Sequence, residues 1–222
     1  MTKDFCGAIF DLDGTLTDSM PVWESAGANY LKTKNIEANS DIVDKMRSIT
    51  LMESSALISE EYGLDESAEE IFKGINKVIE HDFFHTIALK KGVVKILDLF
   101  KRRGVKMCVA TATERRLAEA VLKRNGILDY FNAVLTCNEL NTGKKYSPKI
   151  FLEALDVLGT EKHNTYVFED ALHAVITAKR AGFNVVAVYD DSAKDFKEEI
   201  KNTADLFIRS WHDYYRIIKG EI

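Results

Sequence analysis

The chain has 222 residues, of which 46% are hydrophobic and 29% are charged, a balance that fits one soluble domain with a full core or a core domain that carries a modest insertion. Its formal net charge is −5, with acidic and basic residues interspersed, so no basic stripe predicts a nucleic-acid partner. No apolar run approaches the roughly 18 residues of a membrane helix, and the N-terminus lacks a signal-peptide pattern, so we expect a cytoplasmic protein without membrane contact.

Six short runs rich in β-branched and aromatic residues recur along the chain. Most of them are apolar on both faces, as buried parallel strands are. Strand alternating with helix predicts an α/β protein with a doubly wound, Rossmann-like parallel sheet. The expected strands lie at 6–10, 105–110, 132–137, 164–169, 184–189 and 204–208, and helical patterns separate them at 92–104, 114–126, 147–159 and 171–182.

Residues 19–87 break this alternation, because four helix-like segments follow one another without a convincing strand between them. Such a block cannot fill a strand position, so we expect it to stand above the sheet as an inserted, all-helical cap. The chain is therefore predicted to form a core from residues 1–18 and 88–222. We expect the two hinges near residues 18–21 and 86–91.

Chemically active side chains follow the predicted strands at their carboxyl ends, where open α/β sheets place their functional crevice. Asp11 and Asp13 leave the first strand on the same side of the chain, and Gly14 permits a sharp turn directly after them. Thr111 follows the second strand and precedes a helix, whose N-terminus attracts anions. The other strand ends supply Lys144, Lys145, Glu169 and Asp170.

This set of side chains predicts a site for a phosphate group and a cation. Clustered carboxylate oxygens without His or Cys suit a hard ion such as Mg²⁺. The lysine adds a point charge, and aspartate is an accepted nucleophile for phosphoryl transfer through an aspartyl-phosphate.

The motifs together resemble the haloacid dehalogenase-like (HAD) superfamily, in its branch of helical-cap phosphatases and β-phosphoglucomutase-like enzymes. The first motif of that superfamily, DxDGT, stands at residues 11–15, and the second, a Ser or Thr at a strand end, stands at Thr111. The lysine of the third motif falls on Lys145, although the adjacent Lys144 leaves this assignment open. The fourth motif stands as EDALHAVITAKRAG at 169–182. The match spans nearly the whole chain, in order.

The resemblance implies a role for each matched residue. Asp11 would be the nucleophile, and Asp13 would act first as general acid for the leaving group and then as general base for water. Thr111 and the backbone N–H of Ala112 would hold the phosphoryl oxygens, and Lys145 would neutralise charge. Mg²⁺ would be bound by Asp11, the backbone carbonyl of Asp13, Asp170 and Glu169, the last directly or through a water.

We therefore expect a Mg²⁺-dependent phosphomonoesterase that hydrolyses a small phosphorylated metabolite, as a monomer or weak dimer. The alternative is a β-phosphoglucomutase-like sugar-phosphate mutase, but Trp23 and Leu51 stand where the mutases carry a cap histidine and a cap arginine. Trp23 is a candidate substrate contact. A catalytically silent binding module on the same fold is the non-enzymatic alternative. His81 and His85 have the spacing of a zinc pair, but no third ligand is apparent and a polar pair is expected.

Overall fold

The chain divides into two compact units. The sheet unit consists of residues 1–18 and 87–222, and the helical unit consists of residues 19–86. The structure is a computed structural model, and it describes residues 5–47, 49, 51–140 and 145–220.

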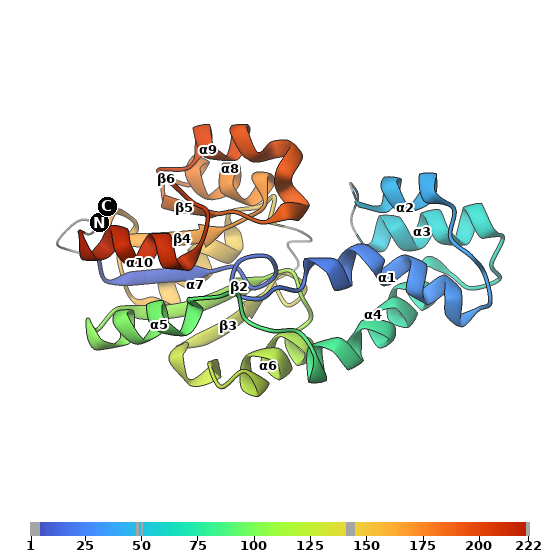
Figure 1. Cartoon of the computed structure of the whole chain (residues 1–222), viewed down its shortest axis with the longest axis horizontal. Helices are drawn as coiled ribbons and strands as arrows, with labels where there is room; N and C mark the ends of the chain where they lie inside the picture. The colour runs from blue at the N-terminus through green and yellow to red at the C-terminus, as the bar shows by residue number, and fades with distance from the viewer. Residues whose placement is uncertain (1–4, 48, 50, 141–144, 221–222) are drawn as a thin grey trace. The chain divides into compact units, whose positions relative to one another are not determined.

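Within the described residues, the sheet unit contains six parallel strands in the order β3-β2-β1-β4-β5-β6 (Figure 1). β1 is central, so that Phe10 pairs with Val109 of β2 on one side and with Phe168 of β4 on the other. The predicted α/β class with a doubly wound parallel sheet is confirmed. The strands are β1 (Gly7–Phe10), β2 (Lys106–Thr111), β3 (Ala133–Thr136), β4 (Thr165–Glu169), β5 (Asn184–Val188) and β6 (Leu206–Ile208).

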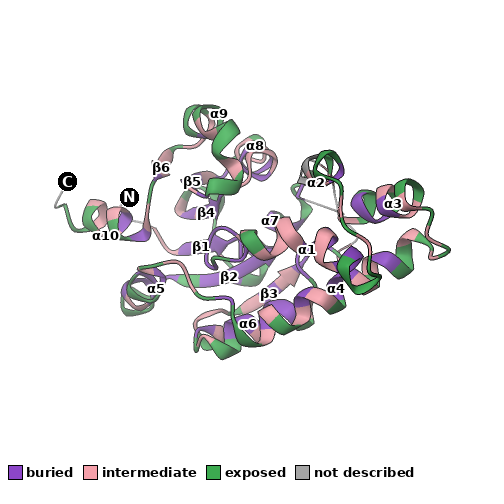
Figure 2. Cartoon of the chain, turned by 45° about the vertical axis from the view of Figure 1, so that its right-hand side comes forward, coloured by how far each residue is buried: buried purple, intermediate pink, exposed green. Residues whose placement is uncertain are grey.

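Helices cover both faces of the sheet, because successive side chains of a buried strand point to opposite faces and both are apolar. Ile9 and Val167 face the core beneath α7 and α8, whereas Phe10 and Phe168 face α5 and α10. Figure 2 shows the central strands almost entirely buried, while the helices are buried on one side only. The helices are α5 (Val93–Arg102), α6 (Arg115–Arg124), α7 (Lys149–Leu158), α8 (Leu172–Arg180), α9 (Lys197–Thr203) and α10 (Trp211–Lys219), with short 3-10 helices at Leu128–Tyr130, Lys162–Asn164 and Asp191–Phe196.

The last two helices, α9 and α10, were not predicted from the sequence pattern. α10 begins after Ser210, whose hydroxyl accepts a hydrogen bond of 3.1 Å from the backbone N–H of Asp213 and so caps the helix. Its Trp211 is 1% exposed, and its ring centroid lies 5.4 Å from that of Phe168, which stacks on Phe10 at 4.7 Å. Burial of each such ring stabilises the fold by about 1.5–3 kcal/mol. α10 therefore completes the core beside β1 and β4.

The helical unit is built from α1 (Met20–Thr33), α2 (Ser40–Arg47), α3 (Leu51–Tyr62) and α4 (Ala68–His85). α4 starts with a reciprocal capping box between Ser67 and Glu70. Gly74 of α4 packs against the ring of Tyr30, such that a Cβ at position 74 would lie 2.3 Å from the Tyr30 Cε2 atom. Among the described residues, no helix combines the length and the apolar character that crossing a membrane requires.

Candidate functional site

The loop after β1 is a tight turn that keeps two carboxylates at the end of the strand. The backbone N–H of Asp11 donates to the carbonyl of Phe168 at 2.9 Å, which extends the pairing between β1 and β4 by one residue. The Leu12 carbonyl then accepts hydrogen bonds from the backbone N–H groups of Leu16 and Thr17. Gly14 adopts a φ of 79°, a conformation that favours glycine, and this permits the turn.

Three buried carboxylates meet at the carboxyl ends of β1 and β4. Asp11, Glu169 and Asp170 each place one oxygen within 4.8 Å of the others. Lys145, which is 3% exposed, donates to Glu169 Oε1 at 2.5 Å and also to Asp11 Oδ1. Lys144, the alternative phosphate lysine, lies outside the described residues. The structure thus brings one lysine and three of the predicted acidic residues together.

The electrostatics of this group follow from burial and from an excess of negative charge. Burial raises the pKa of Asp11 to about 7, since the Lys145 charge offsets it only in part and Glu169 and Asp13 add to the rise. Burial, with the charges of Asp11 and Glu169, also holds the pKa of Asp170 well above its ordinary value. Burial lowers the pKa of Lys145, but the two carboxylates it contacts outweigh this effect and raise that pKa overall. The Lys145 ammonium group therefore contacts two of the three buried carboxylates.

The donor set fits a hard divalent cation. Asp11 Oδ2 is buried and has no hydrogen-bond partner within the described part of the chain, and a buried polar atom in this state calls for a ligand. All side-chain donors in the group are carboxylate oxygens, which Mg²⁺ and similar ions prefer. Asp11, Glu169 and Asp170 could therefore hold a divalent metal ion. The side-chain carboxylate of Asp13 is not part of this group. The backbone carbonyl of Asp13, which is the ligand expected at that position, stays a prediction.

Asp13 instead contacts the end of β2. The Thr113 hydroxyl donates to Asp13 Oδ2 at 2.5 Å, and the backbone N–H of Thr113 donates to the Thr111 Oγ1 atom at 3.0 Å. Thr111 is fully buried, and the following Ala112 is exposed. Thr113 was not predicted as a site residue. The Thr-Ala-Thr spacing was the available signal, because it places a second hydroxyl two residues beyond the strand end.

Asp170 has a second contact that the motif alone did not indicate. The Thr15 hydroxyl donates to Asp170 Oδ1 at 3.1 Å. Asp170 does not cap the following helix, because α8 begins at Leu172 and its N-cap residue, Ala171, makes no side-chain cap. Glu169 Oε2 accepts the backbone N–H groups of Asp170 and Ala171 at 3.2 and 3.4 Å.

The remaining candidates lie in the helical unit. Trp23 is partly exposed and its ring meets that of Phe83 edge-on at 5.6 Å, while Leu51 is the first residue of α3. The substrate contact of Trp23 stays a prediction. The rings of His81 and His85 lie 4.8 Å apart. Among the described residues, neither histidine belongs to a group of three or more metal-ligating side chains.

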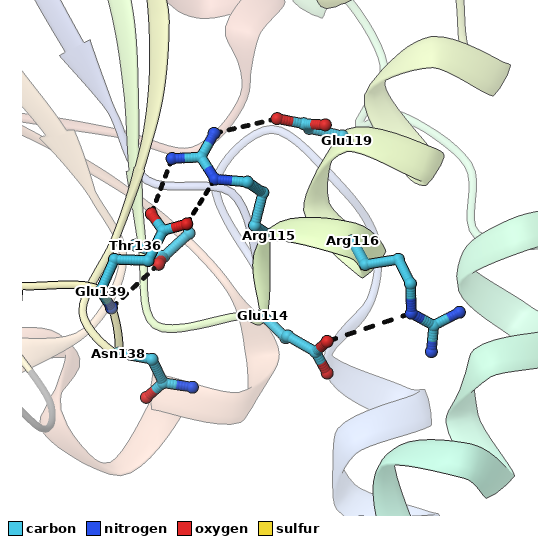
Figure 3. Close-up of a pocket in the computed structure, with 7 residues that line it drawn as sticks. All are labelled: Glu114, Arg115, Arg116, Glu119, Thr136, Asn138 and Glu139. Atoms are coloured by element: carbon cyan, nitrogen blue, oxygen red, sulfur yellow. Dashed lines mark hydrogen bonds and ion pairs between the residues drawn. The ribbon is translucent and has the colours of Figure 1, made fainter.

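A separate hollow of about 410 Å³ lies beside the start of α6 and the end of β3 (Figure 3). The Arg115 guanidinium donates to both carboxylate oxygens of Glu139, at 2.5 and 2.6 Å, and to Glu119 at 2.9 Å. The arginine charge is therefore already neutralised by protein groups. The lining residues, none of them a predicted catalytic residue, are Glu114, Arg115, Arg116, Glu119, Thr136, Asn138 and Glu139.

Comparison with known proteins identifies the family. The model of the haloacid dehalogenase-like hydrolase family matches residues 8–188. The chain is 26% identical to the phosphorylated carbohydrates phosphatase of Thermotoga maritima, covering 85% of this chain and 87% of that protein. It is 23% identical to hexitol phosphatase B of Escherichia coli K12, with 84% of each chain covered.

Solved structures show the same fold. The crystal structure of CbbY from Rhodobacter sphaeroides in complex with phosphate superposes with a TM-score of 0.78, at 22% identity over 92% of this chain and 94% of that one. The β-phosphoglucomutase of Clostridium difficile superposes with a TM-score of 0.75, at 21% identity over 97% and 96% of the two chains. The chain belongs to the haloacid dehalogenase-like hydrolase family, and it is an enzyme of the phosphatase class.

Proposed function

We propose that the protein is a Mg²⁺-dependent phosphomonoesterase, that its substrate is a small phosphorylated carbohydrate or polyol, and that Asp11 carries the phosphoryl group as an aspartyl-phosphate. The observation that carries this proposal is the buried group of Asp11, Glu169 and Asp170, two of which accept hydrogen bonds from Lys145. The substrate class follows from the relatives, which are named for phosphorylated carbohydrates and hexitols.

Asp11 is the nucleophile of the proposed reaction. Lys145 holds its Oδ1 atom, which fixes the orientation of the carboxylate, while Oδ2 has no partner in the described part of the chain. Attack on phosphorus requires the deprotonated form. Since burial raises the pKa of Asp11 to about 7, positive charge beside it favours the reactive form near neutral pH.

Asp13 moves the protons. It protonates the leaving oxygen of the ester and then takes a proton from the water that hydrolyses the aspartyl-phosphate. The Thr113 hydroxyl holds its carboxylate, 2.5 Å away, in one orientation. General acid–base catalysis of this kind contributes about 10²–10⁴-fold to the rate. Thr111 and the backbone N–H of Ala112 bind the phosphoryl oxygens.

Asp11, Glu169 and Asp170 hold the cation in this proposal. When bound, the cation supplies positive charge between the carboxylates and the phosphate dianion, which would otherwise repel one another. Lys145 adds a fixed positive charge on the same group.

The proposal is tested by measuring phosphate release from hexose, hexitol and glycerol phosphates, with Mg²⁺ and with excess chelator. We expect turnover on at least one of these esters, its loss with chelator and its recovery with Mg²⁺. The near-isosteric Asp11→Asn variant should be inactive, because an amide cannot form the phospho-intermediate. If it retained about a tenth of wild-type kcat, the assignment of Asp11 would fall.

The mutase alternative needs its own assay. β-Glucose 1-phosphate is supplied with catalytic glucose 1,6-bisphosphate, and glucose 6-phosphate and free phosphate are followed together. We expect net phosphate release, because Trp23 cannot accept a proton at neutral pH and Leu51 cannot bind a second phosphate. Isomerisation that clearly outruns phosphate release would overturn the phosphatase proposal in favour of a mutase.

A further inference from the structure

The C-terminal helix contacts the loop that carries the proposed nucleophile. The indole N–H of Trp211, the first residue of α10, donates to the backbone carbonyl of Thr15 at 2.9 Å. Both residues are buried, at 1% and 0% exposure. Trp211 lies beyond residues 8–188, the part of the chain that the family model matches. The family match therefore assigns it no role.

Thr15 links α10 to the acidic group through two hydrogen bonds. Its main chain is bonded to α10, and its side-chain hydroxyl donates to Asp170 Oδ1 at 3.1 Å. The two hydrogen bonds join segments that are 196 and 155 residues apart in sequence. The orientation of the Thr15 peptide sets the direction of the Thr15 Cβ and hydroxyl. Loss of the hydrogen bond from Trp211 to the Thr15 carbonyl therefore alters the hydrogen bond from the Thr15 hydroxyl to Asp170.

The indole itself is firmly placed. A Cβ at Gly92, at the start of α5, would lie 3.1 Å from the Trp211 Cβ and 3.2 Å from the backbone nitrogen of His212. On its other side, the Trp211 ring packs against Phe168 and Phe10. A buried N–H that loses its acceptor is costly, so the indole and the Thr15 carbonyl stay paired.

We propose that Trp211 is a positioning residue, which fixes the Thr15 peptide so that the Thr15 hydroxyl holds the Asp170 carboxylate in the orientation that binds the cation. This inference rests on the metal-binding role of Asp170 in the proposed function. It makes α10 part of the catalytic apparatus as well as part of the core.

The first test compares Trp211→Phe with Tyr214→Phe. Both rings lie on α10 in the same buried cluster, but Trp211 alone of the two donates to Thr15 among the contacts described above. Mn²⁺ alone is titrated into each protein, and free Mn²⁺ is measured by electron paramagnetic resonance. We expect Trp211→Phe to weaken binding by about tenfold, the lower end of the effect usual for groups that orient a metal ligand, and Tyr214→Phe to leave the Kd near that of the wild type. Equal weakening in both variants, in step with their Tm values, would overturn the proposal.

A double-mutant cycle separates positioning from packing. Thr15→Val removes the hydroxyl that contacts Asp170 but keeps the backbone carbonyl that accepts from the indole. If Trp211 acts through that hydroxyl, adding Trp211→Phe to Thr15→Val causes little further loss of Mn²⁺ affinity. Additive losses in the double variant would show that Trp211 acts only through the core, and the proposal would fall.

A third measurement does not depend on metal. The indole ¹H–¹⁵N signal of Trp211 is assigned with Trp23→Phe, since the chain has two tryptophans, and is recorded in metal-free protein. We expect Thr15→Val and Asp170→Ala each to shift it. If the wild type bound no Mn²⁺, the metal assignment of the proposed function would fail, while shifts of this signal would still support the positioning of Asp170 by Trp211. An indole signal unchanged in both variants would overturn it.

Discussion

The Thr113 hydroxyl donates to the carboxylate of Asp13 across 2.5 Å, and Thr113 is 4% exposed. This short hydrogen bond restricts the orientation of the proposed acid–base residue. We predict that Thr113→Val lowers kcat by about tenfold, equivalent to about 1.4 kcal/mol in the barrier, with a smaller change in KM. Thr113→Ser keeps the hydroxyl and is the matched control. The measurement is steady-state phosphate release, and equal losses in the two variants would contradict this role.

The contact between Lys145 and Asp11 predicts how kcat/KM depends on pH. Its positive charge lowers the pKa of Asp11, which burial otherwise raises. We predict that Lys145→Met shifts the acid limb of the kcat/KM profile to higher pH, because Asp11 must lose its proton to attack. Lys145→Arg keeps the charge and should move the limb less. The measurement is kcat/KM at saturating Mg²⁺ from about pH 5 to about pH 9, which is the range in which the acid limb is expected. An unmoved acid limb in Lys145→Met would argue against this coupling.

At the residue scale, the strand-end positions of Asp11, Glu169 and Asp170 could be predicted because parallel strands all end at one edge of a sheet. The hydrogen bonds of Thr15 to Asp170 and of Thr113 to Asp13 could not be predicted. A loop hydroxyl can donate to any nearby acceptor, so the sequence does not indicate which acceptor it contacts. Thr113 donates to Asp13, which lies 100 residues away in the sequence. Only the packed sheet brings such partners together.

At the scale of elements, one glycine of α1 and one glycine of α4, each packed against a neighbouring helix, allow a matched comparison. A Cβ at Gly74 would lie 2.3 Å from the buried ring of Tyr30, whereas a Cβ at Gly27 would lie 2.8 Å from the flexible end of Met46. Alanine in a helix interior normally adds about 1 kcal/mol of stability over glycine.

We predict that Gly74→Ala nevertheless destabilises the protein by about 1–3 kcal/mol, the usual cost of overpacking, because a buried ring cannot move aside. Gly27→Ala should be close to neutral, since the thioether of Met46 can rotate. Urea unfolding followed by circular dichroism measures both. The pair Gly74→Ala and Tyr30→Leu should recover part of the loss, and a stabilised Gly74→Ala single variant would show that this packing is not tight.

All six strands could be predicted, because each is a short apolar run bounded by polar residues. The helix α10 could not be predicted from its interior, since Trp211, Tyr214 and Tyr215 are residues that also favour strands. Its capping serine, Ser210, with Asp213 three residues on, was the usable signal. The helix is fixed by tertiary burial of its aromatic rings and not by local propensity.

At the scale of the whole molecule, the acidic group links stability to pH and to metal. The pKa values of Asp11, at about 7, and of Asp170 are raised in the folded protein, so the folded state binds more protons than the unfolded state. Stability from Asp11 is fully present below its ordinary pKa near 4 and is lost as the pH rises through about 7, and the raised pKa of Asp170 changes stability in the same direction. We predict that the metal-free protein has a lower Tm at pH 8 than at pH 5.5.

Added Mg²⁺ should raise the Tm more at pH 8 than at pH 5.5, because it binds the deprotonated carboxylates. Differential scanning calorimetry with chelator and with Mg²⁺ measures both effects. Asp11→Asn is the control, since an amide does not titrate, and its Tm should depend less on pH. A metal-free wild type whose Tm rises from pH 5.5 to pH 8 would contradict the prediction.

The position of β1 in the middle of the sheet has a consequence for synthesis of the chain. Gly7 pairs with Lys106 and Thr165, and Phe10 packs against Trp211, so β1 is made long before the last of the segments that it contacts. At roughly 5–20 residues per second, translation from Phe10 to Trp211 takes on the order of 10–40 s. The helical unit, being one continuous stretch, has all its own partners much earlier. Until β2 has also been made, β1 is an unpaired apolar strand of the nascent chain, and it is the stretch that we expect chaperones to protect.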